Sequence, residues 1–106
     1  MAVREQLIAK FDMFPQSVLE QEKNYLMSIM DLIEGAVTGF EKDYARIEVT
    51  HFSMWHTSIF NKENNQYEDS INCRIDLGLF EGDRMVLIHQ MFFRQPGSIH
   101  LSWVRV

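Results

Sequence analysis

The sequence predicts an α+β fold: two N-terminal helices, at about residues 3–12 and 17–39, packed on a four-stranded antiparallel meander sheet. Three observations support this prediction. Apolar residues recur at helical spacing in the N-terminal part of the chain, the period changes to two after Ala45, and turn motifs divide the C-terminal part into short segments. A chain of 106 residues can bury one hydrophobic core and is too short for two, so residues 1–106 are expected to form one domain.

Each helix is predicted from an apolar face and from signals at its ends. Pro15 ends the first helix because proline disfavours helical backbone in the residue before it. The second helix begins at a capping box, in which the Ser17 hydroxyl and the Glu20 carboxylate satisfy backbone N–H groups, and it ends near Gly39. The first apolar face comprises Val3, Leu7, Ile8 and Phe11. The second comprises Leu19, Leu26, Ile29, Met30, Ile33, Val37 and Phe40.

Period-two alternation of apolar residues predicts four strands, at residues 46–60, 71–79, 85–93 and 99–106. The polar, acidic residues 61–70 are expected to form a loop between the first two strands. A three-residue turn at 81–83 and a turn at Pro96-Gly97 join the others. One face of the first strand is expected to carry Ile47, Val49, Trp55 and Ile59.

The charge and the cysteine content narrow the possible partners. The formal net charge is −5, and the acids are concentrated in the helical part of the chain. Nucleic-acid binding needs basic side chains on phosphates, so this charge argues against nucleic acid and favours a basic protein. The single cysteine, Cys73, excludes an internal disulfide, and no apolar run suits a signal peptide or a membrane span. A cytoplasmic protein without membrane contact is therefore predicted.

The sequence carries no motif for catalysis, metal binding or cofactor binding. His51 and His56 are five residues apart on one strand and should point to opposite faces, so they cannot share a metal ion. His89 and His100 are expected roughly three or four residues out of register on paired strands, too far apart for a common ion. We therefore expect no metal and no cofactor, and we consider an enzyme the less favoured hypothesis.

The remaining candidates for chemistry are Cys73 and the pair formed by Asp76 and His89. Cys73 shares a strand face with Ile75 and is expected to be a buried, unreactive thiol. Asp76 and His89 form the best acid and base pair, because a three-residue turn would pair Ile75 with His89 and leave Asp76 diagonal to it. Their side chains would then point to opposite faces, so no catalytic residue is assigned.

The predicted sheet carries more apolar surface than two helices can cover. Residues 85–93 are apolar on both faces, and so is the first strand. This surplus either lies inside a strongly bent sheet, lines a small-molecule pocket, or is offered to another protein chain. Met and aromatic side chains are enriched at protein interfaces, which favours the interface as the functional alternative.

The leading functional hypothesis is a non-enzymatic inhibitor, in the manner of bacterial immunity proteins or antitoxins. It would bind a basic partner such as a nuclease toxin, with opposite charges steering the encounter. The residues expected to bind this partner are Glu63, Tyr67, Glu68 and Asp69 in the loop, and Phe52, Met54, Val86, Ile88 and Phe92 on the strands.

Two alternatives stay open. The element order is similar in outline to the nuclear transport factor 2-like group of cone-shaped α+β folds, which implies a ligand or substrate in the concavity of a curved sheet. The polar groups of such a site would be His56, Asp76, His89 and His100. The third hypothesis is a dimeric adaptor subunit, which the same apolar surplus would serve.

Overall fold

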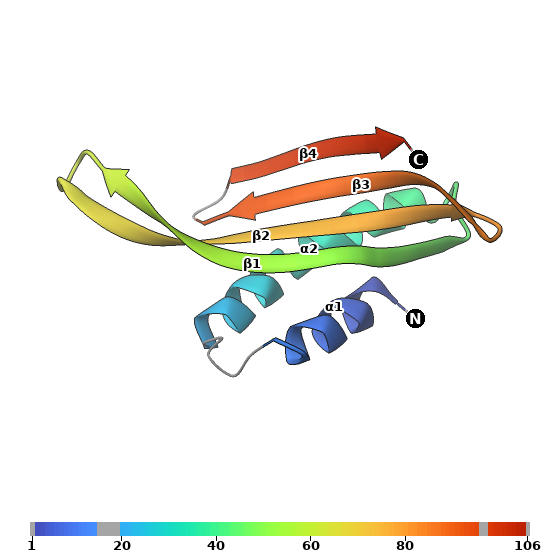
Figure 1. Ribbon diagram of the computed structural model, residues 1–106, viewed down its shortest axis with the longest axis horizontal. Helices are drawn as coiled ribbons and strands as arrows, with labels where there is room; N and C mark the ends of the chain where they lie inside the picture. The colour runs from blue at the N-terminus through green and yellow to red at the C-terminus, as the bar shows by residue number, and fades with distance from the viewer. Residues whose placement is uncertain (1, 15–19, 96–97, 106) are drawn as a thin grey trace.

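The computed structural model of the protein describes residues 2–14, 20–95 and 98–105, and its α+β fold confirms the predicted class (Figure 1). The strands form one antiparallel sheet in the order β1-β2-β3-β4, so each strand pairs with its neighbour in the chain. Both helices pack on the same face of this sheet. The elements are α1 (Val3–Asp12), α2 (Glu20–Phe40), β1 (Arg46–Asn61), β2 (Gln66–Glu81), β3 (Arg84–Arg94) and β4 (Ser98–Arg105).

The hydrophobic core lies between the helices and one face of β2. The β2 residues that alternate toward the helices are all buried: Ile71, Cys73, Ile75, Leu77 and Leu79. Each helix covers them with one buried face: Val3 and Leu7 of α1, and Leu26, Ile29, Met30, Ile33 and Val37 of α2. This is the packing that the helical periodicity predicts. Neither of the described helices has the length and apolar character needed to cross a membrane.

The ends of α2 agree with the prediction as far as the structure describes them. The helix ends at Phe40, next to the predicted end at Gly39. Tyr44 N–H then donates to the Phe40 carbonyl at 2.9 Å and starts the turn into β1. The predicted capping box begins at Ser17, which lies outside the described residues.

The predicted loop at residues 61–70 is wrong in its length. β1 continues to Asn61 and β2 already begins at Gln66. Residues 66–70 pair with residues 57–61 as two continuous antiparallel strands. The polar composition correctly indicated a hairpin turn at this place in the chain. It did not indicate that residues 66–70 belong to a strand.

Asparagine side chains explain why this hairpin can turn so tightly. Asn61 Oδ1 accepts a hydrogen bond from Glu63 N–H at 2.9 Å, and Asn64 Oδ1 accepts one from Gln66 N–H at 3.1 Å. Asn65 has a φ of 56°, a left-handed conformation that asparagine tolerates better than most residues. Side chains therefore replace backbone hydrogen bonds within the turn.

The turn between β2 and β3 is also shorter than predicted. It consists of Gly82-Asp83, with a φ of 61° at the glycine, instead of the three residues 81–83. A register shift near the end of β2 adds to the difference. The expected pairing of His89 with Ile75 is therefore wrong, and His89 pairs with Leu77.

A bulge in β1 changes which residues face the helices. The register shifts at Thr50, so the alternation of side chains reverses beyond it. Phe52 and Met54 consequently pack against the core, and Trp55 points to the opposite face. The prediction of one shared strand face is wrong beyond the bulge for two of its four members: Trp55 and Ile59.

The face of the sheet opposite the helices is polar at its centre. Arg74 forms a two-point ion pair with Asp76, with Nε–Oδ1 and Nη2–Oδ2 distances of 3.1 and 2.8 Å. Gln90 donates to Asp76 at 3.4 Å and accepts from Ser102 Oγ at 3.0 Å. A hydrogen-bonded network can face water, so the centre of this face needs no second layer of helices. Alternating apolar residues of β3 stay half-buried: Val86, Ile88 and Phe92.

Candidate functional site

β1 and β2 extend beyond the other strands and form a projecting hairpin, residues 57–70, which we call the arm (Figure 1). The ladder between β2 and β3 begins only at Asn72, so the arm is a two-stranded ribbon. The arm is paired from Thr57 with Ser70 to the turn. Most of its side chains are exposed. The arm therefore projects from the helix-covered part of the sheet and presents most of its side chains to solvent.

The arm carries an aromatic pair and three carboxylates. Phe60 lies opposite Tyr67 on the paired strands, and their ring centroids are 5.2 Å apart. Tyr67 is 74% exposed and Phe60 is 43% exposed, although aromatic rings are the side chains that protein interfaces prefer to bury. The exposed carboxylates are those of Glu63, Glu68 and Asp69.

His56, at the root of the arm, lies between two carboxylates. Its Nδ1 is 2.8 Å from Asp69 Oδ2 on the paired strand, and its Nε2 contacts Glu22 Oε1 on α2. Hydrogen bonds to Glu22 first, and then to Asp69, raise the pKa of His56 above its ordinary value of 6.5. Both ring nitrogens donate when the imidazole is protonated, so His56 ties the arm to α2.

This arrangement is suited to holding the arm and not to catalysis. A general base needs an unprotonated nitrogen that faces a substrate, whereas both nitrogens of His56 face carboxylates. The Glu22 and Asp69 carboxylates contact different nitrogens of the His56 ring, at opposite ends of the imidazole. These three side chains therefore do not converge on a single metal ion. Across the ranges that the structure describes, no three His, Cys, Asp or Glu side chains converge as metal ligands.

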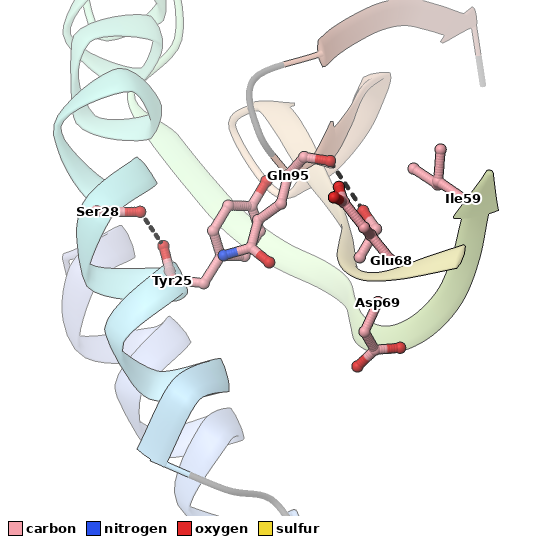
Figure 2. A pocket seen from close by; sticks show the side chains of 7 residues that line it. Tyr25, Ser28, Ile59, Glu68, Asp69 and Gln95 are labelled. Atoms are coloured by element: carbon pink, nitrogen blue, oxygen red, sulfur yellow. Dashed lines mark hydrogen bonds between the residues drawn. The ribbon is translucent and has the colours of Figure 1, made fainter. Parts of the chain in front are cut away.

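A cleft of about 490 Å³ lies between α2, the root of the arm and the end of β3 (Figure 2). Its two serine hydroxyls are used internally, because Ser28 donates to the Tyr25 carbonyl at 2.6 Å and Ser70 donates to the Gln95 carbonyl at 2.8 Å. Burial raises the pKa of Tyr25 to about 12, so its phenol stays neutral. The lining residues are Tyr25, Ser28, Ile59, Glu68, Asp69, Ser70 and Gln95. They offer no nucleophile paired with a base.

The predicted partner-binding residues do not all share one surface. Phe52 faces the helices, where its ring lies 5.1 Å from that of Phe14, and Met54 packs beside it against the core. Ile88 and Phe92 of β3 point to the opposite side of the sheet, and Val86 lies at the register shift, where it has no paired residue on β2. The other four stay on one hairpin, the arm, where Tyr67 and Asp69 alternate to one face of the ribbon, Glu68 to the other, and Glu63 lies in the turn.

The polar groups expected in a curved-sheet pocket are also separated. His56 and His89 face the helices, whereas Asp76 and His100 occupy positions of the opposite parity. The prediction that Asp76 and His89 face apart is confirmed, as is the predicted opposition of His51 and His56. The cleft lies beside the arm and contains none of these five residues.

His89 and Cys73 are reactive residue types, but both are buried away from solvent. His89 is 3% exposed and packs in a cluster with the rings of Phe40 and Trp103, at centroid distances of 4.9 and 4.1 Å, and those two rings lie 5.3 Å from each other. Its Nδ1 has no hydrogen-bond partner among the residues that the structure describes, and burial lowers the pKa of its imidazole below 6.5. Cys73 is buried, as predicted, and burial raises the pKa of its thiol to about 12. Neither group is placed to act on a substrate.

The partner-binding residues predicted from the sequence include none on the last strand, yet this strand carries exposed apolar side chains on both faces. Leu101 and Trp103 pair with Met91 and His89 and so face the helix side. Val104 faces the opposite side, and the three are 54%, 50% and 43% exposed. The predicted meander already places this strand at an edge of the sheet, but the exposure of its apolar side chains was not predicted.

Comparisons with known proteins do not place the chain in a family: no family model, no curated protein and no solved structure matches it. The functional argument therefore rests on the residues of this chain.

Proposed function

We propose that this chain is a non-enzymatic, protein-binding inhibitor of the immunity-protein or antitoxin kind, and that it engages a basic partner through the arm. One observation carries the proposal. The arm projects from the domain and exposes the Phe60 and Tyr67 rings beside the carboxylates of Glu63, Glu68 and Asp69. A rigid aromatic anchor with charges at its rim is a common composition of protein interfaces.

The electrostatics of the chain support a basic partner. A net charge of −5 accelerates the encounter with an oppositely charged protein, and carboxylates at the contact reject acidic competitors. The contacts of His56 favour binding over catalysis, because they stiffen the root of the arm and leave neither ring nitrogen for proton transfer. A stiff arm loses less conformational freedom on binding.

The test begins with capture of the partner from the native host by the tagged full chain, followed by affinity measurements on the purified partner. The arm variant carries Glu63→Lys, Glu68→Lys and Asp69→Lys. Its control reverses three exposed acids outside the arm, Glu41, Asp43 and Glu81, and so has the same net charge. Because Asp69 also contacts His56, Tyr67→Ala tests the arm without touching an ion pair.

We expect a basic partner whose affinity falls as salt is raised. The arm variant should bind about 100-fold more weakly, Tyr67→Ala about 10-fold or more, and the charge-matched control within about 5-fold of wild type. Thermal unfolding of each variant checks that the fold is retained. Equal affinity of the arm variant and its control, or binding that does not respond to salt, would overturn the proposal.

A further inference from the structure

The two edges of the sheet differ in how their backbone groups are satisfied. On the β1 edge, the Gln6 side chain of α1 takes the place of a neighbouring strand: Nε2 donates to the Ile47 carbonyl at 3.3 Å and Oε1 accepts from Val49 N–H at 2.8 Å. β4 is the other edge, and in the described part of the chain no element pairs with its outer side. An unpaired edge is a template for another strand.

We propose that the outer edge of β4 pairs with β4 of a second copy of this chain. The two strands run antiparallel about a two-fold axis at Ser102, and the two sheets join into one of eight strands. The helices of both copies then lie on the same side of the joined sheet, because a two-fold axis perpendicular to a sheet preserves its faces. This inference goes beyond the proposed function and does not depend on it.

The two residues that flank Ser102 on β4, Leu101 and Trp103, are both large and apolar, which favours a second copy over an unrelated strand. An axis at Ser102 places Leu101 of each copy opposite Trp103 of the other, on the helix side. These side chains are 54% and 50% exposed in the single chain, and both would lose solvent contact at the junction. An interface between identical copies must be self-complementary. The two-fold axis repeats the contact between Leu101 and Trp103, so the junction contains it twice.

The charges of β4 also permit self-pairing. Residues 98–105 contain one arginine, Arg105, one histidine, His100, and no acid, lysine or proline. About the proposed axis, each Arg105 lies opposite Ile99 of the other copy, and the two arginines are separated by about 20 Å along the strands at about 3.3 Å per residue. Like charges therefore do not meet, and the lysines and prolines that natural proteins use to block an edge are missing.

The arm takes no part in the proposed pairing of β4. It belongs to β1 and β2 and extends beyond the ladder that joins β2 to β3. The joined molecule would present two arms to its partners. The oligomeric state and the binding function can thus be tested separately.

Sedimentation equilibrium of the full chain up to about 0.5 mM tests the association. Wild type should approach twice the chain mass of 12.6 kDa as concentration rises. Leu101→Lys should remain a monomer, because it places a charge at the apolar junction. Trp55→Lys is the matched control, since Trp55 is a 42% exposed residue on the β1 edge, and it should associate like wild type. A wild-type monomer at all concentrations, or an equal loss in both variants, would overturn the inference.

Cysteine cross-linking tests the register. Ser102→Cys places the two new thiols directly opposite each other, within disulfide reach for antiparallel strands, and Cys73 is buried and should not compete. Val104→Cys is the control, because its thiols would be about 13 Å apart along the strands. We expect at least about ten times more covalent dimer from Ser102→Cys. Cross-linking of Val104→Cys alone, or of neither variant, would contradict the proposed pairing.

Discussion

The β1 and β4 edges show that a small sheet can close one side with few residues and leave the other open. β1 is bulged at Thr50, carries the exposed ion pair of Arg46 with Glu48 at 3.3 Å, and is capped by Gln6 of α1. β4 has one charged residue and exposed apolar side chains on both faces. Whether an edge is closed therefore depends on specific side chains and bulges, and not on the strand's apolar content alone.

Thr50, the bulge residue of β1, packs closely on Gly78 of β2, and a side chain added at Gly78 should have the largest effect on stability. A Cβ added there would lie 2.6 Å from Met85 Sδ and 2.9 Å from Thr50 Cγ2. Gly78→Ala should lower the free energy of unfolding by about 1–3 kcal/mol in urea titrations. The control is Gly35→Ala on α2, where a Cβ meets nothing within 4 Å and should stabilise by up to about 1 kcal/mol. Similar effects at both positions would contradict this explanation.

Removing the cap of the β1 edge should have the next largest effect. Gln6→Leu leaves the Ile47 carbonyl and the Val49 N–H without their side-chain partner, at a cost of about 1–2 kcal/mol in the free energy of unfolding. Gln6→Glu keeps the acceptor for Val49 and loses the donor to Ile47, so its stability should be intermediate. If Gln6→Leu is as stable as wild type, the cap does not hold this edge.

The contacts of His56 at the root of the arm should make the free energy of unfolding depend on pH. The pKa of His56 is raised in the folded state, so its stabilising contribution is complete below 6.5 and is lost as the pH rises through the raised pKa. The lowered pKa of His89 acts in the opposite sense, and its contribution is lost as the pH falls below 6.5. His56→Gln should therefore remove the loss of stability that occurs as the pH rises. It should keep the loss of stability at acidic pH, which His89 causes.

Urea unfolding of wild type and His56→Gln between about pH 5 and 9 measures both effects. The difference between the two proteins should be largest at the acidic end of this range and should decline as the pH rises. A difference that does not change with pH would mean that the contacts of His56 with Glu22 and Asp69 involve no stabilising charge.

The outer side of β4 should show the smallest effect on the stability of the single chain. Leu101→Lys should change the free energy of unfolding by less than about 0.5 kcal/mol when measured at low concentration, because the side chain is 54% exposed. The midpoint of wild-type unfolding should rise with protein concentration, and that of the variant should not. A loss of more than about 1 kcal/mol at low concentration would place Leu101 in the core and not at a free edge.

The fold was predictable because periodicity reports which side chains face a core. The two helices and the central strand, with Ile71, Cys73 and Ile75 buried, are direct consequences of it. Register was not predictable, because the bulge at Thr50 and the short turn at Gly82 each move the pairing by amounts that composition does not encode.

The candidate site was predictable only in part. The charged and aromatic residues of the arm were identified by their local composition, although within a supposed loop. The contact between Glu22 and His56 joins residues 34 positions apart, and the exposure of Leu101 and Trp103 results from the position of β4 at the edge of the sheet. Such features depend on tertiary structure, so no local pattern reveals them.

Amide hydrogen exchange along the two edge strands tests the difference between them most directly. Exchange of the full chain would be compared at low and high protein concentration. The β4 amides that are not bonded to β3 should become protected as concentration rises, and the β1 amides near Val49 should stay equally protected throughout. Unchanged exchange in β4, or concentration-dependent protection of β1 instead, would contradict the assignment of β4 as the open, self-pairing edge.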